Sequence, residues 1–110
     1  MGASKTENYT ELQNHISLIS KALGHPARVA IVDYLIKVDT CICGDIVNEL
    51  PLSQPTVSQH LRELKNAGII QGTIEGNAIC YCLNQSTLES FINYLSEINQ
   101  TLKTKSNTCC

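Results

Sequence analysis

The segment over residues 53–70, SQPTVSQHLRELKNAGII, constrains the fold of this 110-residue chain more than any other. Ser53 stands where a helix N-cap belongs, Pro55 lies in the first turn, and Gly68 follows the last periodic residue. These signals predict one helix with a defined start and end. Its apolar residues recur at helical spacing and should form a buried stripe, which consists of Val57, Leu61 and Leu64.

The opposite side of this predicted helix carries polar side chains. Gln59, Arg62 and Asn66 occupy that side, and Thr56 and Ser58 flank its start. Amides can pair with adenine edges, and hydroxyls can donate or accept hydrogen bonds at bases. Two interpretations remain open from these residues alone: a helix that reads DNA bases, or an ordinary amphipathic helix with a solvated face.

Composition describes a single small globular domain. Apolar residues make up 43% and charged residues 16%, and no apolar run approaches the roughly 18 residues that a membrane span needs. The first residues contain no apolar segment suited to secretion. We therefore expect a cytoplasmic protein without membrane contact, and its small core would benefit from oligomerisation.

The net charge of −2 disfavours general affinity for nucleic acid, because such affinity depends on neutralising phosphates with Lys and Arg. Local charge can outweigh the total, however. Arg62 and Lys65 both fall in the predicted helix over 53–67, and a dimer would carry two copies of this basic pair.

Helical periodicity also organises the preceding residues. Residues 1–10 are polar and are expected to be flexible. Spacing of apolar residues predicts a first helix over 11–22, a second over 26–38 and a short third over 44–50 that ends in a tight turn. Two helices joined by about three residues, the second with polar leading turns, are typical of a helix-turn-helix.

Beyond Gly68 the pattern changes to that of a β-hairpin. Two β-rich runs, 69–74 and 78–83, flank a Gly-Asn pair that favours a tight turn. A hairpin directly after a helix-turn-helix is a wing. Alternation predicts that the core face of the second strand carries Ile79, Tyr81 and Leu83.

A last helix is predicted to begin with a capping box formed by Ser86 and Glu89. Its apolar stripe is longer than one small domain needs, and we expect it to pack on the first helix of the same subunit and of a partner. The stripe comprises Leu88, Phe91, Ile92, Leu95, Ile98 and Leu102.

The predicted fold is mainly α with a β-hairpin: a winged helix-turn-helix with five helices and a two-stranded wing. One domain with terminal dimerisation helices spans 11–102, and a flexible tail with two cysteines spans 103–110.

Six cysteines occur as two Cys-x-Cys pairs, Cys41 with Cys43 and Cys80 with Cys82, and as a terminal Cys-Cys. Without a secretion signal, close pairs indicate metal or redox chemistry rather than a disulfide framework. The absence of Cys-x-x-Cys argues against a zinc ribbon or a thioredoxin-like motif. The three His residues are not clustered with any cysteine, so a thiol enzyme is not expected.

Three segments together carry a family resemblance: LGHPARVAIVDYL, CICGDIVNELPLSQPTVSQHLRELKNAGII and the hairpin end CYCLN. They closely resemble the ArsR/SmtB family of metal- and metalloid-responsive repressors, and the likeness covers about residues 12–100. It implies a homodimeric winged helix-turn-helix that binds a palindromic operator in double-stranded DNA and is released by an inducer.

The resemblance also assigns residues to the DNA contact. Arg62 is placed for a phosphate, and Asn77 falls at the wing tip, where the family often has Arg, so the wing contact is expected to be weaker here. The positions that meet the major groove are Ser53, Gln54, Thr56, Ser58 and Gln59.

In the arsenic-responsive branch, the matching cysteine stretch reads Cys-Val-Cys-Asp-Leu-Cys. CICGDIV keeps the first two thiols, Cys41 and Cys43, but has Val47 near the third. The resemblance thus implies trivalent arsenic or antimony as inducer and no resident cofactor. Placement at the start of the helix over 44–50 would favour the thiolate form.

A third thiolate could come from Cys109 or Cys110, since no other role is evident for them. Cys80 and Cys82 share one face of a wing strand and either bind a soft ion, oxidise, or are simply tolerated there. The alternative function within the same fold is a repressor that senses thiol oxidation or a soft divalent metal (cadmium, lead or zinc). The last helix contains no His, so the family's zinc site on that helix is not expected.

Overall fold

The computed structural model describes residues 8–38, 42–43, 53–75 and 78–105; at 38, 42–43, 54 and 73–80 it describes the backbone alone. Four helices lie in these ranges: α1 (Glu11–Ala22), α2 (Pro26–Val38), α4 (Gln54–Asn66) and α5 (Gln85–Thr104). Three strands accompany them: β1 (Ile42–Cys43), β2 (Ile70–Glu75) and β3 (Ala78–Leu83). The helix expected over 44–50 lies outside the described residues.

The helix starts follow local capping chemistry. Thr10 caps α1 through a capping box, in which the Gln13 N–H donates to Thr10 Oγ1 and the Thr10 N–H donates to Gln13 Oε1, each at 3.0 Å. The expected capping box of Ser86 and Glu89 is wrong. α5 starts two residues earlier, with Asn84 at the N-cap and no side-chain hydrogen bond to the helix. It also continues to Thr104, beyond the expected end at 102.

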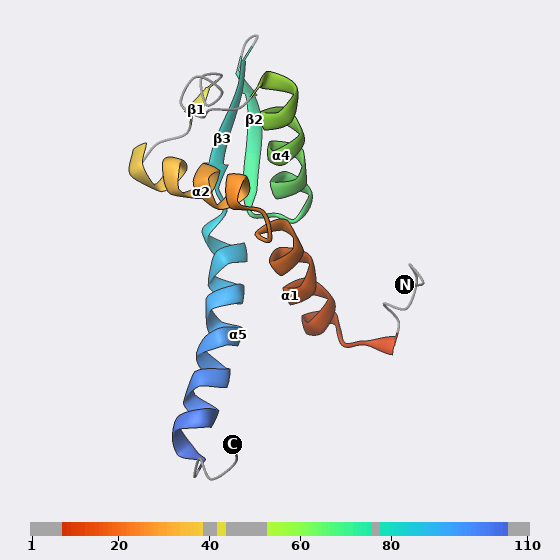
Figure 1. Cartoon of the computed structure of the whole chain (residues 1–110), viewed down its shortest axis with the longest axis vertical. Helices are drawn as coiled ribbons and strands as arrows, with labels where there is room; N and C mark the ends of the chain where they lie inside the picture. The colour runs from red at the N-terminus through yellow and green to blue at the C-terminus, as the bar shows by residue number, and fades with distance from the viewer. Residues whose placement is uncertain (1–7, 39–41, 44–52, 76–77, 106–110) are drawn as a thin grey trace.

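The sheet is larger than the two-stranded wing that the sequence predicts. β3 is the central strand of the order β1-β3-β2, and both pairings are antiparallel. β2 and β3 flank residues 76–77, as the hairpin prediction requires. β1 pairs with the other edge of β3, so Cys43 lies in a strand. Figure 1 shows β1 and β2 on either side of β3.

The core lies where α2 and α4 pack on the sheet. The predicted stripe of α4 is buried, with exposed fractions of 2% for Val57, 6% for Leu61 and 0% for Leu64. Tyr81 and Leu83 pack against this core as expected for the inner face of β3. The other buried members are Ile19, Ala22, Ile31, Leu35, Ala67, Ile69 and Ile70.

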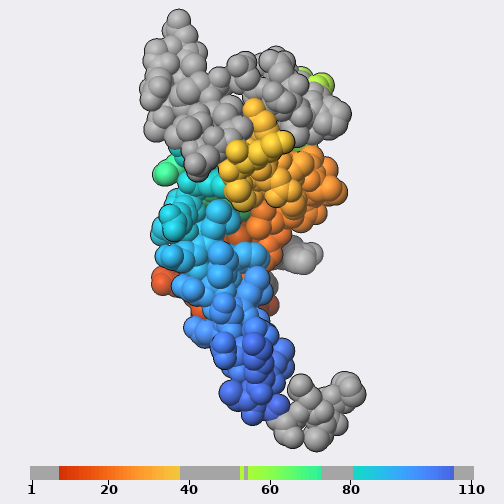
Figure 2. All heavy atoms as spheres, turned by 90° about the vertical axis from the view of Figure 1, so that its left-hand side faces the viewer, coloured from red at the N-terminus to blue at the C-terminus, as the bar shows by residue number. Residues whose placement is uncertain are grey.

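α5 projects away from the sheet, and α1 lies beside the part of α5 nearest the body (Figure 1). Figure 2 shows the far part of α5 standing clear of the body. None of the helices in the described ranges combines the length and apolar character required to cross a membrane.

Candidate nucleic-acid interface and thiol positions

The polar side of α4 faces solvent. Thr56, Ser58, Gln59 and Arg62 are exposed, as is Ser53 at the N-cap. The structure therefore brings these predicted contact residues together on one accessible surface. The side chain of Gln54, and Asn77, lie outside the described residues.

Ser53 occupies the N-cap as predicted, with φ −73° and ψ 157°, but its side chain makes no capping hydrogen bond to the backbone. Its Oγ lies 3.0 Å from Oγ1 of Thr56 instead. The Ser53 hydroxyl thus accepts no hydrogen bond from the first backbone N–H groups of α4. Unsatisfied N–H groups at a helix start are a favourable place for a phosphate.

Gln59 is held by its neighbours on the same helix. Its Nε2 donates to Glu63 Oε2 at 3.1 Å, and its Oε1 accepts from Arg62 NH1 at 3.2 Å. These two bonds orient the amide, which has two N–H donors and two acceptor lone pairs and can therefore also contact a base. Glu63 was not among the predicted site residues, although its spacing four residues after Gln59 is a recognised signal for such a pair.

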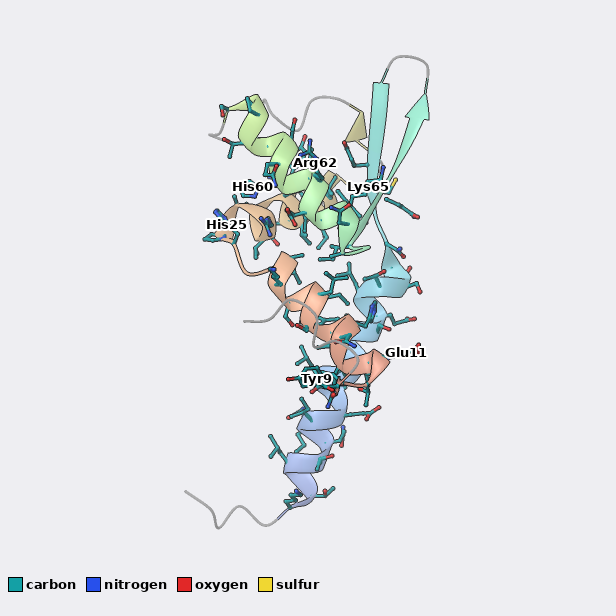
Figure 3. The ribbon with its side chains drawn as sticks, turned by 90° about the vertical axis from the view of Figure 1, so that its right-hand side faces the viewer. Tyr9, Glu11, His25, His60, Arg62 and Lys65 are labelled. Atoms are coloured by element: carbon teal, nitrogen blue, oxygen red, sulfur yellow. The ribbon has the colours of Figure 1, made fainter. Side chains whose placement is uncertain are left out.

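The inner side of α4 is fixed by a polar contact around His60, which is 7% exposed. Arg28 donates from Nε to His60 Nδ1 at 3.1 Å and from NH1 to the carbonyl of Ala22 at 3.3 Å. The His25 ring lies 4.5 Å from the His60 ring, centroid to centroid, and its Nδ1 accepts from the Ala27 N–H. Figure 3 shows His25 and His60 side by side where α4 passes the start of α2.

This contact sets the protonation state of His60. Burial lowers the pKa of His60 below its ordinary value of 6.5, and the nearby charges of His25 and Arg28 lower it further. Because Nδ1 accepts from Arg28, the neutral ring carries its proton on Nε2. His60 is therefore a structural residue of the helix, and its partner Arg28 was not among the predicted site residues.

A tight joint connects α4 to the wing. Gly68 has φ +79°, and a Cβ at this position would lie 3.2 Å from Oγ1 of Thr87. Glycine meets both demands, because it adopts positive φ without strain and leaves room for α5. The Asn84 N–H donates to the Ile69 carbonyl at 2.8 Å, which fastens the start of α5 to the start of the wing.

One cysteine of each Cys-x-Cys pair lies opposite the other in the sheet. Cys43 of β1 is the Cα partner of Cys80 of β3. Cys82 is half-buried and disulfide-bonded. Cys41, Cys109 and Cys110 lie outside the described residues. Among the side chains that the structure describes, which do not include those of Cys43 and Cys80, no three His, Cys, Asp or Glu residues are grouped to hold a metal ion.

An apolar surface runs along α5, and α1 exposes apolar side chains as well. Four α5 residues of the predicted stripe are exposed by 41–58%: Ile92, Leu95, Ile98 and Leu102. Leu12 and Leu18 of α1 are exposed by 50% and 47%. Such an extended apolar surface is typical of an interaction site.

Comparison with known proteins identifies similar sequences. The family described as "Bacterial regulatory protein, arsR family" matches residues 25–71. The transcriptional repressor SdpR of Bacillus subtilis is 36% identical over 77 residues, which cover 70% of this chain and 84% of SdpR. An arsenical resistance operon repressor of Staphylococcus aureus is 33% identical over 84 residues, covering 76% of this chain and 80% of that protein.

Solved structures share the fold. An ArsR-like transcriptional regulator from Rhodococcus superposes with a TM-score of 0.74 at 19% identity, covering 86% of this chain and 88% of that one. A second similar structure is the homodimeric winged helix-turn-helix DNA-binding domain of a possible ArsR-family regulator from Mycobacterium bovis. Its TM-score is 0.66 at 20% identity, and 98% of each chain is covered.

Proposed function

Because the chain belongs to the ArsR family of bacterial regulatory proteins, we propose that it is a DNA-binding transcriptional repressor released from its operator by trivalent arsenic or antimony. Members of this family are transcriptional regulators and not enzymes. One observation supports DNA binding: the buried side of α4 packs in the core and leaves the polar side of the helix exposed to solvent. Ser53, Thr56 and Gln59 would meet base edges, and Arg62 a phosphate.

The homodimer is part of the same proposal. A palindromic operator needs two recognition helices about one helical turn apart, which one copy of α4 cannot supply. The exposed stripe of α5 offers an apolar surface for a second copy of the chain. The similar domain from Mycobacterium bovis is homodimeric, which supports this assembly.

Inducer binding would use cysteine thiolates. Cys41 and Cys43 are the first proposed ligands, with Cys109 or Cys110 as candidates for a third. Soft thiolates suit soft ions such as trivalent arsenic. Support comes from the likeness to an arsenical resistance operon repressor.

The direct test measures binding of the reduced full-length chain to DNA from upstream of its own gene by fluorescence anisotropy at several salt concentrations. We expect binding that weakens with salt, and release on addition of arsenite. Cys41→Ser and Cys43→Ser should bind DNA but resist release. Binding that arsenite leaves unchanged in the wild type would refute the inducer, and no binding at any salt concentration would refute the repressor.

A second candidate is a repressor of the same fold that senses thiol oxidation or a soft divalent metal. The disulfide of Cys82 favours oxidation, because it brings a second cysteine sulfur within bonding distance. Separate titrations of the protein–DNA complex with arsenite, cadmium and a thiol oxidant would distinguish the three signals.

A further inference from the structure

The two Cys-x-Cys pairs lie far apart in the sequence, but the sheet brings one cysteine of each pair, Cys43 and Cys80, together. Cys43 and Cys80 are directly opposed in the antiparallel pairing of β1 and β3. The Cα atoms of opposed residues lie about 4.5–5.5 Å apart, and such residues share one face of a sheet. Cys82 follows two residues after Cys80, at a distance of about 6.5 Å, and so belongs to the same face.

That face is the outer one. The register pairs Cys82 with Gln71, which is exposed, while the intervening Tyr81 packs against the core. Cys82 itself is half-buried. Cys82 is thus partly accessible to solvent on this face.

Cys82 forms a disulfide. Its disulfide shows that another cysteine sulfur reaches it. At least two sulfurs thus meet beside the β1–β3 pairing, in which Cys43 and Cys80 are opposed.

We propose that Cys43, Cys80 and Cys82, when reduced, form a three-thiol site for trivalent arsenic on the outer face of the sheet. Arsenous acid and three thiols would give one arsenic centre with three As–S bonds and three molecules of water, with no change of oxidation state. Zinc prefers four ligands in a tetrahedron, so three thiols on one face suit trivalent arsenic better. In this site Cys80 and Cys82 take the places that the ligand set proposed above gives to Cys41 and to Cys109 or Cys110.

The site rests on the proposed function, and it lies on a sheet that is connected to the DNA-contacting helix. β3 is hydrogen-bonded to β2, which joins α4 through Gly68, and it leads directly into α5. Arsenic bound across β1 and β3 would fix β1 relative to β3 and β2, and β2 is joined to α4 through Gly68. The orientation of the DNA-contacting face would then depend on occupancy of the site.

The test compares reduced full-length wild type with Cys80→Ser/Cys82→Ser and Cys109→Ser/Cys110→Ser. A phosphine reductant converts the disulfide to two thiols, is itself oxidised to the phosphine oxide with oxygen from water, and is removed under nitrogen. Arsenite is then titrated by ultraviolet absorbance of the As–S bond, and X-ray absorption counts the sulfurs on arsenic. Thermal unfolding identifies any variant that fails to fold, and Cys80→Ala/Cys82→Ala then replaces the serine variant.

We expect three sulfurs on arsenic in the wild type and in the tail variant. The β3 variant should lose affinity about tenfold or more, because each lost thiolate removes a bond to arsenic. Unchanged affinity with three sulfurs in the β3 variant, or a loss confined to the tail variant, would overturn the site.

DNA release is measured separately with the same samples. Arsenic bound to Cys43, Cys80 and Cys82 without any release of DNA would refute the proposed inducer while leaving the site in place. Release by arsenite that persists fully in the β3 variant would refute the site while leaving the proposed function in place.

Discussion

Arg28 donates from Nε to His60 Nδ1 at 3.1 Å, and this hydrogen bond joins the start of α2 to the inner side of α4. The second bond of Arg28, to the Ala22 carbonyl, adds the end of α1. One guanidinium therefore sets three helices relative to one another, and the helix with the exposed polar face is one of them.

Acid should destabilise the protein through His60. Its folded-state pKa is lowered, mainly by burial, so the unfolded state binds the proton more readily. The stability contributed by the neutral ring is fully present above about pH 6.5 and is lost as pH falls through the lower folded-state pKa. Urea unfolding between pH 8 and pH 5 should show this loss in wild type and in His15→Gln, but less of it in His60→Gln. Identical pH profiles for wild type and His60→Gln would contradict the assignment.

Two isoleucines on α2 offer a matched comparison of core and surface. Ile31 is 0% exposed and Ile36 is 60% exposed. Ile31→Ala should cost about 2–5 kcal/mol, because it leaves a cavity in the core, whereas Ile36→Ala should change stability by less than about 1 kcal/mol. Chemical unfolding of both variants measures the difference, and equal losses would mean that α2 packs with another face.

Removal of Arg62 should weaken DNA binding and reduce its salt dependence. Each lost phosphate contact lowers the slope of log K against log salt by about 0.9, hence by about 1.8 for a dimer with two copies. Arg62→Ala is compared with Lys103→Ala, which removes an exposed charge at the far end of α5. An unchanged slope for Arg62→Ala would exclude the phosphate contact.

Neutralising Glu63 should strengthen DNA binding. Its carboxylate accepts from Gln59 and carries a negative charge on the helix that approaches phosphates. Glu63→Gln removes that charge and loosens the hold on the Gln59 amide, so we expect about two- to tenfold tighter binding. Glu97→Gln on α5 makes the same charge change as a control. Weaker binding by Glu63→Gln would show that the carboxylate instead holds Gln59 in the binding conformation.

A charge on the apolar face of α5 should separate the subunits. Leu95 is 48% exposed and lies in the middle of that face. Leu95→Glu should give a monomer at micromolar concentration by light scattering after size exclusion, because burying an unpaired carboxylate is costly. Asn93→Glu adds the same charge on a different side of the helix and should leave the assembly intact. Dimers in both variants would exclude this face.

Local patterns predicted most elements because they reflect local physics. α1 and α2 begin and end close to the expected residues, and the stripe of α4 is buried, since periodicity reports directly on which side faces the core. The two-residue strand β1 could not be predicted, because it forms only by pairing with residues nearly forty positions later. The opposition of Cys43 and Cys80 was hidden for the same reason.

The contact around His60 is a second feature that the sequence could not predict. Arg28 lies 32 residues before His60 in the sequence, and only the packing of α2 against α4 brings its Nε to His60 Nδ1. By contrast, Glu63 could have been included from its spacing to Gln59 alone.

Because β3 is the central strand and continues into α5, a rotation at the end of β3 would displace the far end of α5. The strand runs into α5 through Asn84, and a helix of 20 residues is about 30 Å long. A rotation of only about 5° at Asn84 would therefore move the far end by about 2.6 Å, comparable to half a helical turn. A small change on the sheet would be magnified along this helix before it reached a second subunit.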